Sequence, residues 1–308
     1  MGLMKVISSN YTLLLPGQTA FHVDSLQEVA QHHLFREHYE DVCDRLDSDP
    51  LKEIEEGKTD SLNLNLNNSL LTSLVSYVSY ESFRNKPSFS EPGFLAGYSV
   101  GQWMALCLAG SLPFSVLLEV LCERAHLMNE AVRGKSTGML SVIGLKEDVV
   151  KEICLEIEET ESETVNIANY NCLGQYTLAG SIRGISLARK KLSGMNPRKV
   201  VDLPMSGAWH SIFMEPAVVP FRDYLASIEL KPSSLPVACN VTGKELPSER
   251  EKLLDALAAH LCKPVLWEKC IKHLIALGSK GFIELSRVPT LSKFGFFIDR
   301  SLPHQTAF

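Results

Sequence analysis

The sequence predicts an α/β protein in which a parallel sheet forms the larger part and a smaller domain is inserted into it. Three stretches of the 308-residue chain support this prediction. The apolar run Tyr11–Leu15 ends at a Pro-Gly pair, which is typical of a buried strand that enters a tight turn. A second apolar run, at 93–97, leads through a glycine-flanked turn into an apolar helix. From Gly138 to Leu203 the order becomes strand, helix, strand, strand, helix, strand.

The remaining elements follow from local periodicity. Helices are expected within 22–58, at 61–84 after a short alternating start, and at 114–132, with a loop at 87–92. The inserted domain is expected at 135–204. Its elements are strands at 139–145, 165–171, 175–179 and 199–203, and helices at 147–160 and 182–193.

This βαββαβ order is the ferredoxin-like pattern. The larger domain would then comprise residues 1–134 and 205–308. Its C-terminal part is expected to contain strands at 235–241 and 281–285, and helices at 250–262 and 267–277.

The composition excludes several classes of protein. Hydrophobic residues make up 45% and charged residues 21%, which argues against a disordered or fibrous chain. The net charge of −6 lacks the basic excess of nucleic-acid binders, so we expect no nucleic-acid partner. The longest apolar candidate, Phe94–Leu112, is interrupted by polar residues and glycines, so we expect no membrane span.

The cysteines and the N-terminus favour a cytoplasmic location. The 8 cysteines include no Cys-x-x-Cys pair and no histidine at zinc-ligand spacing, so we expect reduced thiols and no metal site. The segment Met1–Pro16 carries one lysine and a short apolar run, too short for the core of a signal peptide.

A Gly-x-Ser-x-Gly pattern lies at Gly97–Gly101, between the expected strand and helix. Glycines on both sides permit the sharp turn that projects a serine hydroxyl from the edge of a sheet, which makes Ser99 a candidate nucleophile. The N–H of Val100 would then point to the place where an oxyanion forms. The alternative is that Ser99 only caps the following helix.

A serine nucleophile needs a base, and His210 is the candidate among the 9 histidines. It follows an expected strand and a Ser-Gly turn, although a hydrogen-bonded core histidine is the alternative. His260 lies at a helix end, where it could cap carbonyl groups. The turn at Gln18 could supply a second N–H for an oxyanion. Arg124, on an apolar helix, needs a carboxylate from the protein or from a substrate.

In this order, the motifs resemble those of the malonyl-CoA:acyl-carrier-protein transacylases, including the stand-alone acyltransferases of polyketide synthases. The resemblance extends over about Leu13–Leu291. Its segments are Leu-Pro-Gly-Gln18, Gly97–Gln102, Glu123–Val132, Asn169–Gly180, Ser-Gly-Ala-Trp-His210-Ser, Asn240–Gly243 and Lys263–Trp267.

The resemblance implies an α/β-hydrolase-like large domain and a ping-pong acyl transfer. Ser99 would attack the thioester of malonyl-CoA, with His210 as the base of a Ser–His dyad oriented by carbonyl oxygens. The N–H groups of Gln18 and Val100 would hold the oxyanion, and Arg124 would bind the free malonyl carboxylate. The acceptor would be the phosphopantetheine thiol of an acyl carrier protein. The resemblance implies no metal and no cofactor of its own, since CoA arrives as substrate and phosphopantetheine belongs to the partner.

The chain departs from the family's pattern near the expected site. Tyr98 stands where the family has His, and His260 where bacterial fatty-acid members have Gln. Trp209 takes the place of a Phe found in malonyl-selective members, and its bulk favours malonyl over methylmalonyl groups. We expect these three residues to contact the substrate. The other departures are Gln102 for Glu, Ala125 for Gly, and Ser286–Thr290 for a Gly-Pro-Gly turn.

The sequence leaves other functions open. A thioester hydrolase of the same fold conflicts with Arg124, whereas a transferase that moves larger acyl groups between carriers is compatible with Tyr98. An inactive carrier-binding module conflicts with the presence of Ser99 and His210. An unrelated esterase would need an acid, for which Asp202 is the one candidate at a strand end.

Overall fold

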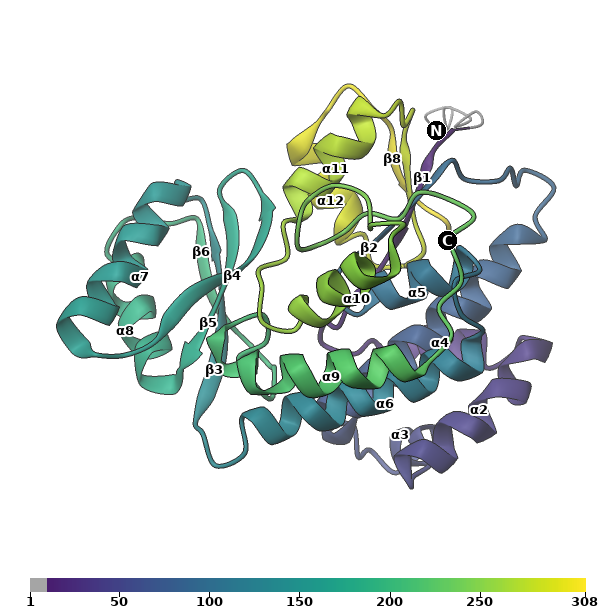
Figure 1. Ribbon diagram of the computed structural model, residues 1–308, viewed down its shortest axis with the longest axis horizontal. Coiled ribbons are helices and arrows are strands. Elements are labelled where there is room, and N and C mark those ends of the chain that lie inside the picture. The colour runs from purple at the N-terminus through teal and green to yellow at the C-terminus, as the bar shows by residue number, and fades with distance from the viewer. Residues whose placement is uncertain (1–9) are drawn as a thin grey trace.

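The computed structural model describes residues 10–308, and the first nine residues, which carry part of the N-terminal expectation, lie outside this range. The described chain is a mixed α/β structure with two four-stranded sheets (Figure 1). Most of the predicted strands and helices are confirmed to within a few residues. Among residues 10–308, no helix combines the length and apolar character that a bilayer span requires.

The first sheet is parallel and has the strand order β2-β1-β7-β8. All residues of β1 are buried, as expected for a central strand covered on both faces. In the register of β1 and β2, Leu15 lies opposite Gly97, so the two strands end side by side and the chain segments that follow them meet. The strands are β1 (Thr12–Leu15), β2 (Phe94–Gly97), β7 (Phe282–Glu284) and β8 (His304–Thr306).

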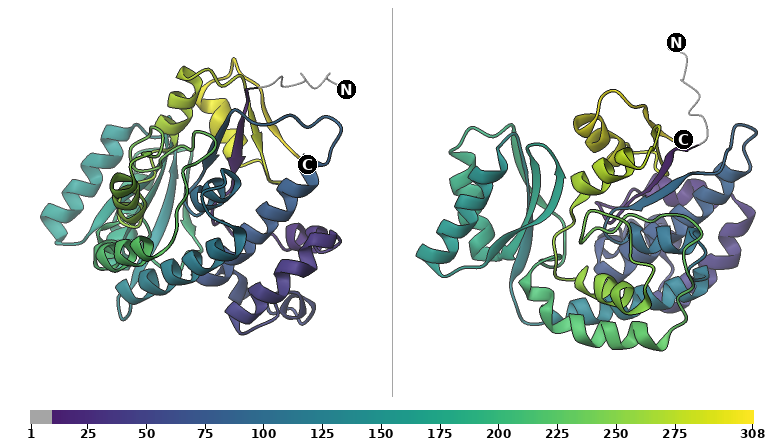
Figure 2. Two further views of the ribbon diagram at one scale, coloured as in Figure 1. Left: turned by 45° about the vertical axis from the view of Figure 1, so that its right-hand side comes forward. Right: turned by 45° about the horizontal axis from the view of Figure 1, so that its top comes forward.

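Helices surround this sheet, with the long α6 packed against α4 and α9 (Figures 1 and 2). The helices of this part are α1 (Val23–Val29), α2 (His33–Leu46), α3 (Pro50–Glu55), α4 (Asn65–Arg84), α5 (Gly101–Leu108), α6 (Phe114–Ala131), α9 (Glu215–Ser227), α10 (Arg250–Ala259), α11 (Trp267–Ala276) and α12 (Leu291–Ile298). Short 3-10 helices lie at Asp60–Asn63 and Ile212–Met214.

The second sheet is antiparallel and has the strand order β4-β5-β3-β6. Its two helices cover the face that points away from the first sheet (Figures 1 and 2). The opposite face meets the larger part, where the N–H of Tyr170 donates to the carbonyl of Val265 at 2.9 Å. The elements are β3 (Thr137–Ile143), α7 (Glu147–Glu161), β4 (Val165–Cys172), β5 (Gln175–Ser181), α8 (Ile182–Ser193) and β6 (Lys199–Leu203).

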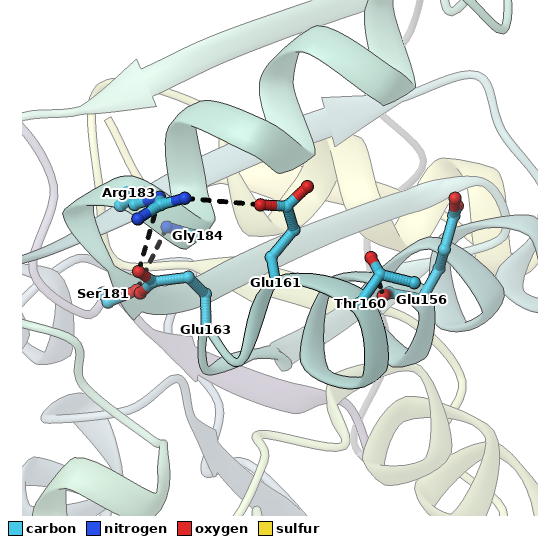
Figure 3. A network of polar contacts seen from close by, with 7 residues as sticks. All are labelled: Glu156, Thr160, Glu161, Glu163, Ser181, Arg183 and Gly184. Carbon is cyan, nitrogen blue, oxygen red and sulfur yellow. Dashed lines mark hydrogen bonds and ion pairs between the residues drawn. The ribbon is translucent and has the colours of Figure 1, made fainter.

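Polar contacts join the end of α7 to the start of α8 on the outer surface (Figure 3). The Ser181 hydroxyl accepts from the N–H of Gly184 at 3.1 Å, which caps α8, and donates to Glu163 at 2.6 Å. Arg183 pairs with Glu161 at 3.4 Å and with Glu163 at 3.6 Å. Every charge of this cluster therefore has a partner and access to solvent.

The expected strand at 235–241 is wrong. Only Val237 pairs in parallel with Leu95, and Ala238 makes one antiparallel bridge to Glu245. Pro236 has no N–H to donate, and the chain turns back after Asn240, so no regular ladder extends along this segment.

The C-terminal part contains two further differences from prediction. The helix expected at 250–262 ends at Ala259, because the N–H groups of Leu261 and Cys262 bond three residues back, to Ala258 and Ala259, in a tighter turn. The carbonyls of His260 and Leu261 beyond this end bond to His210. The prediction also missed α9, α12 and β8. The helix α9 contains Pro220 in its interior, a residue that argues against a helix in local sequence reasoning.

Candidate active site

The turn between β2 and α5 forces Ser99 into a left-handed backbone conformation, with φ of 50°. Only glycine fits on either side of it. A Cβ on Gly97 would lie 1.9 Å from the carbonyl oxygen of Gly101, and one on Gly101 would lie 2.4 Å from that of Leu15. The tight packing of β1, β2 and α5 therefore explains both glycines of the motif and places the Ser99 hydroxyl at the end of the sheet.

The Ser99 hydroxyl forms a hydrogen bond with Nε2 of His210 at 2.7 Å. The other ring nitrogen, Nδ1, donates to the carbonyl of His260 at 2.8 Å, which leaves Nε2 as the proton acceptor in the neutral imidazole. Burial and the positive charge of Arg124 lower the pKa of His210 to about 3. The imidazole is therefore neutral at physiological pH and is placed to take the serine proton.

An acidic third member is not part of this arrangement, since a carbonyl occupies the position behind the imidazole. Asp202, the acid that an esterase triad would need, forms an ion pair with Arg189. Its side chain is 66% exposed. The structure therefore favours the dyad over the Asp202 triad.

Two backbone N–H groups lie beside the nucleophile without a partner among residues 10–308: those of Gln18 and Val100. A Cβ on Gly17 would lie 2.4 Å from the carbonyl of Tyr98, so the turn after β1 packs directly on the nucleophile turn. The Gln18 side chain points to α4, where its Nε2 donates to the Asn65 carbonyl at 2.9 Å. Free N–H groups at this edge, one of them at the start of α5, suit a developing negative charge.

Arg124 is a buried cation that has no counter-ion among residues 10–308. Its side chain on α6 is 1% exposed, and none of its three guanidinium nitrogens has a hydrogen-bond partner among the described residues. Burial lowers its pKa to about 10, so it still carries its charge at physiological pH. An unpaired buried charge is strongly unfavourable. This cost indicates that an anion that is not part of the described chain pairs with the guanidinium of Arg124.

A cavity of about 340 Å³ lies between the two sheets and opens beside the nucleophile turn. Gln18 and Tyr98 line it from the turns that follow β1 and β2, and Asn171 and Thr177 line it from the antiparallel sheet. Ser99, His210 and Arg124 do not line this cavity and are buried beside it. Among residues 10–308 no cluster of three metal-ligand side chains is present, and all eight cysteines are unpaired.

Comparisons with known proteins agree on one family. No protein-family model matches the chain. The chain is 31% identical over 301 residues to the malonyl CoA-acyl carrier protein transacylase of Bacillus subtilis (strain 168), covering 96% of this chain and 92% of the relative. The polyketide biosynthesis protein PksE of the same organism is 30% identical over 89% of this chain and 34% of PksE.

A solved structure extends this likeness to the fold. The acyl-carrier-protein S-malonyltransferase from Burkholderia pseudomallei 1710b superimposes with a TM-score of 0.88 at 29% identity, over 97% of this chain and 96% of that one. The chain belongs to the malonyl CoA-acyl carrier protein transacylase family.

The three residues at which the sequence departs from the family pattern near the site, Tyr98, His260 and Trp209, have different surroundings in the structure. The Tyr98 hydroxyl donates to Asn171 on the antiparallel sheet at 2.7 Å, and its ring packs edge-on against Trp267. Burial raises the pKa of Tyr98, so the phenol stays protonated. Tyr98 therefore both lines the cavity and connects the two sheets.

His260 adds a second buried imidazole to the transacylase site. Its ring centroid lies 5.0 Å from that of His210, and neither of its ring nitrogens has a partner among the described residues. Burial, His210 and Arg124 hold its pKa well below the usual range. A neutral, unbonded imidazole next to the dyad has a free donor and a free acceptor.

Trp209 is 3% exposed and belongs to the main apolar core. Its ring folds over Gly207, where an added Cβ would meet the indole at 2.5 Å. The indole N–H has no partner among the described residues. The structure thus places Trp209 next to the dyad histidine in sequence, with its ring in the core and not on the cavity lining.

Two residues that bond to the nucleophile turn had no role in the sequence-based hypothesis. Asn240 accepts from the N–H of Ser99 at 2.8 Å, and Gln102 accepts from the N–H of Asn240 at 2.7 Å. The Asn-Val-Thr-Gly motif marked Asn240 as part of the family pattern. Its contact with a turn 141 positions away in sequence could not be read from local spacing.

Proposed function

We propose that this protein transfers a malonyl group from malonyl-CoA, through an ester on Ser99, to the phosphopantetheine thiol of an acyl carrier protein. The family assignment and the names of the relatives support this proposal. The observation that carries it is the buried Arg124, which has no partner in the described part of the chain and lies beside the Ser99–His210 dyad. A malonyl thioester supplies both an acyl carbon for Ser99 and a carboxylate for the guanidinium.

The first half-reaction forms the acyl-serine and releases CoA. Nε2 of His210 takes the proton of Ser99 as Oγ attacks the thioester carbonyl carbon. The N–H groups of Gln18 and Val100 stabilise the oxyanion, for which one donor contributes about 3 to 4 kcal/mol. The intermediate collapses, the C–S bond breaks, and the CoA sulfur leaves with the proton from His210.

The second half-reaction repeats these steps with a new nucleophile. His210 takes the proton of the carrier's phosphopantetheine thiol, whose sulfur attacks the malonyl ester. A second oxyanion forms at the same N–H groups. The Ser99 oxygen then leaves and recovers its proton from the imidazolium. No resident cofactor or metal takes part in this proposal.

The carboxylate of the substrate has a second effect on the dyad. In the empty site, the Arg124 charge is one of the causes that depress the pKa of His210. A bound carboxylate neutralises this charge, so the imidazolium that forms during attack is less disfavoured. A malonyl donor would therefore improve its own base, whereas an acetyl donor would not.

We propose that Tyr98, Trp209 and His260 shape the acyl site. His260 could donate to the malonyl carboxylate next to Arg124, since its ring nitrogens are buried and bond to none of the residues that the structure describes. Trp209 would exclude an α-methyl group through the bulk of its ring against Gly207. Tyr98 would form the wall toward the cavity between the sheets.

We further propose the domain division expected from the sequence. Residues 1–134 and 205–308 would form an α/β-hydrolase-like catalytic domain, supported by the parallel sheet and the turn at Ser99. Residues 135–204 would form a ferredoxin-like domain, supported by the strand order of the antiparallel sheet. The unpaired cysteines support a cytoplasmic location, and PksE supports a role in polyketide or fatty-acid-like biosynthesis.

The test is intact-mass measurement after incubation with malonyl-CoA, methylmalonyl-CoA or acetyl-CoA, with Ser99→Ala as control. The proposal expects a malonyl adduct that is absent in Ser99→Ala and disappears when a holo carrier protein is added. If Ser99 is acylated by an acylated carrier protein but by none of the CoA esters, the function is acyl transfer between carriers instead. Release of free acid without a carrier would indicate a hydrolase, and no adduct at all would indicate a carrier-binding module.

A further inference from the structure

The segment before Asn240 runs along the free edge of β2. The N–H of Leu95 donates to the carbonyl of Pro236 at 3.0 Å, and the N–H of Ala238 donates to the carbonyl of Leu95 at 2.9 Å. This is the pattern of a parallel ladder, in which one residue bonds to both neighbours of its partner. If the ladder continued, the main chain of Asn240 would bond to Gly97 and Ser99.

The main chain of Asn240 is used elsewhere. Its N–H donates to Oε1 of Gln102 at 2.7 Å, and its carbonyl accepts from the N–H of Leu266 at 2.8 Å. Its side-chain amide makes the two missing bonds instead. Nδ2 donates to the carbonyl of Gly97 at 2.8 Å, and Oδ1 accepts from the N–H of Ser99 at 2.8 Å.

A side-chain amide suits this place for a physical reason. It has the same donor and acceptor groups as a peptide unit, but it reaches further from the main chain. At Ser99 the backbone leaves the line of the strand, with φ of 50°, so a straight main chain could not follow. The amide of Asn240 thus bonds on both sides of Tyr98, at the strained point of the turn.

We propose that Asn240 is a positioning residue for the nucleophile. It holds the left-handed conformation of Ser99, which a non-glycine residue keeps only when its surroundings fix it. It also occupies the N–H of Ser99, so the oxyanion meets the N–H groups of Val100 and Gln18. This inference deepens the proposed function, because it rests on Ser99 as the nucleophile of that function.

Gln102 supports Asn240 from inside α5. Its side chain is fully buried, Oε1 binds the N–H of Asn240, and Nε2 has no partner among the described residues. Gln102 therefore contributes an acceptor only. The nucleophile turn, Asn240 and the first turn of α5 are closed into one hydrogen-bonded unit that excludes solvent.

The test measures the reactivity of Ser99 toward a fluorophosphonate probe, which needs no acyl donor. Labelling by mass gives a maximal rate and a half-saturating concentration, with Ser99→Ala as the blank. Asn240→Ala should lower the maximal rate about 100-fold, the size expected for a misplaced nucleophile. The half-saturating concentration should change little, because the turn and not the binding site is altered.

Two further comparisons separate positioning from general damage. Asn240→Asp keeps an oxygen for the N–H of Ser99 but opposes a second oxygen to the Gly97 carbonyl, so its rate should lie between wild type and Asn240→Ala. Gln102→Glu, which keeps the acceptor, should lose less than Gln102→Met. Thr242→Ala is the control, because it removes the hydrogen bond from the N–H of Lys244 in the turn after Asn240, which does not involve Ser99. Its maximal labelling rate should equal that of the wild type.

The outcomes are distinct. A folded Asn240→Ala variant that labels at the wild-type maximal rate would overturn the inference. An Asn240→Ala variant in which only the half-saturating concentration of the probe rises would overturn it as well. If Asn240→Ala does not fold, wild-type rates in both Asn240→Asp and Gln102→Met overturn it. Graded probe rates without any malonyl adduct would leave the role of Asn240 intact and remove the proposed function instead.

Discussion

The two parts of the molecule differ in the burial and the pairing of their charged side chains, as one arginine from each part shows. In the antiparallel part, the side chain of Arg183 at the start of α8 is 67% exposed and pairs with Glu161 and Glu163 (Figure 3). Around the parallel sheet, Arg124 is 1% exposed and pairs with no described residue. Exposed pairs contribute little and need no ligand, whereas a buried unpaired charge is costly unless a ligand completes it.

The same contrast extends to the rest of each part. The outer surface of the antiparallel part carries further exposed pairs, such as Lys191 with Glu156 at 2.9 Å. The parallel part holds the dyad and the unbonded imidazole of His260. The smaller part still touches the site, because Asn171 binds Tyr98 and Asn166 donates to the carbonyl of His210 at 3.2 Å. The guanidinium of Arg124 and the imidazole of His260, both buried and without a partner among residues 10–308, thus mark the place where the proposed substrate is expected.

The largest effect is expected for Arg124→Met. Malonyl loading should fall by about 100-fold or more, because a charge-assisted pair with the carboxylate is lost. Acetyl loading should not fall, because the charge that depresses the pKa of His210 is removed at the same time. The free energy of unfolding should rise by about 1 to 3 kcal/mol, since an unpaired buried cation is replaced by an apolar chain. Loading rates by mass and denaturant unfolding measure the two quantities.

The matched control for this comparison is Arg183→Met. An exposed pair contributes about 0 to 1 kcal/mol, so both unfolding and malonyl loading should stay near wild type. Equal losses of malonyl and acetyl loading in Arg124→Met would contradict the carboxylate role of that arginine.

The second prediction concerns pH. For a histidine with an ordinary pKa of about 6.5, the neutral fraction at pH 5 is roughly 30-fold smaller than at pH 8. In the empty site, burial and Arg124 lower the pKa of His210 to about 3. At malonyl-CoA concentrations well below saturation, where the free enzyme titrates, the rate of Ser99 acylation should therefore be nearly flat from pH 8 to pH 5. Rates of adduct formation across this range provide the measurement, and a decline centred near pH 6.5 would rule out the buried neutral base.

The lowered pKa values of the two buried histidines also determine how the free energy of unfolding depends on pH. Below about pH 6.5 the unfolded chain gains protons on His210 and His260 that the folded chain does not bind. The free energy of unfolding should therefore fall as the pH drops from about 6.5 toward 3, and this fall should be smaller in His260→Gln. Urea unfolding at several pH values compares the two proteins.

The third prediction is a change of selectivity at Trp209. In Trp209→Ala, the ratio of methylmalonyl to malonyl loading should rise about tenfold, the usual effect of one methyl group in a pocket. Removing a buried indole should also reduce the free energy of unfolding by about 3 to 5 kcal/mol. If selectivity is unchanged in a folded variant, another side chain excludes the methyl group.

The smallest effect is expected where the two parts touch. Tyr98→Phe removes the hydrogen bond to Asn171 and leaves the ring in place. The free energy of unfolding should fall by about 1 kcal/mol, and malonyl loading should change only a few-fold. A large loss of loading would show that the phenol hydroxyl contacts the substrate.

Local sequence patterns determined much of this protein. The apolar run before Pro16 predicted β1, and helical spacing predicted α4, α6, α7 and α8. Short apolar runs around these helices predicted the four strands of the antiparallel sheet. The glycines around Ser99 predicted the nucleophile turn because the steric rule acts within five residues. Family motifs pointed to His210 and Arg124, although neither is near Ser99 in sequence.

The tertiary structure decided the rest. Three features of the site depend on segments far apart in the chain: the carbonyl behind His210, the absence of a partner for Arg124 among the described residues, and the amide of Asn240 at the nucleophile turn. The expected strand at 235–241 failed for the same reason, since its partner β2 turns away at Ser99. Periodicity records which side of an element is buried, but contacts between distant segments are fixed only when the elements pack.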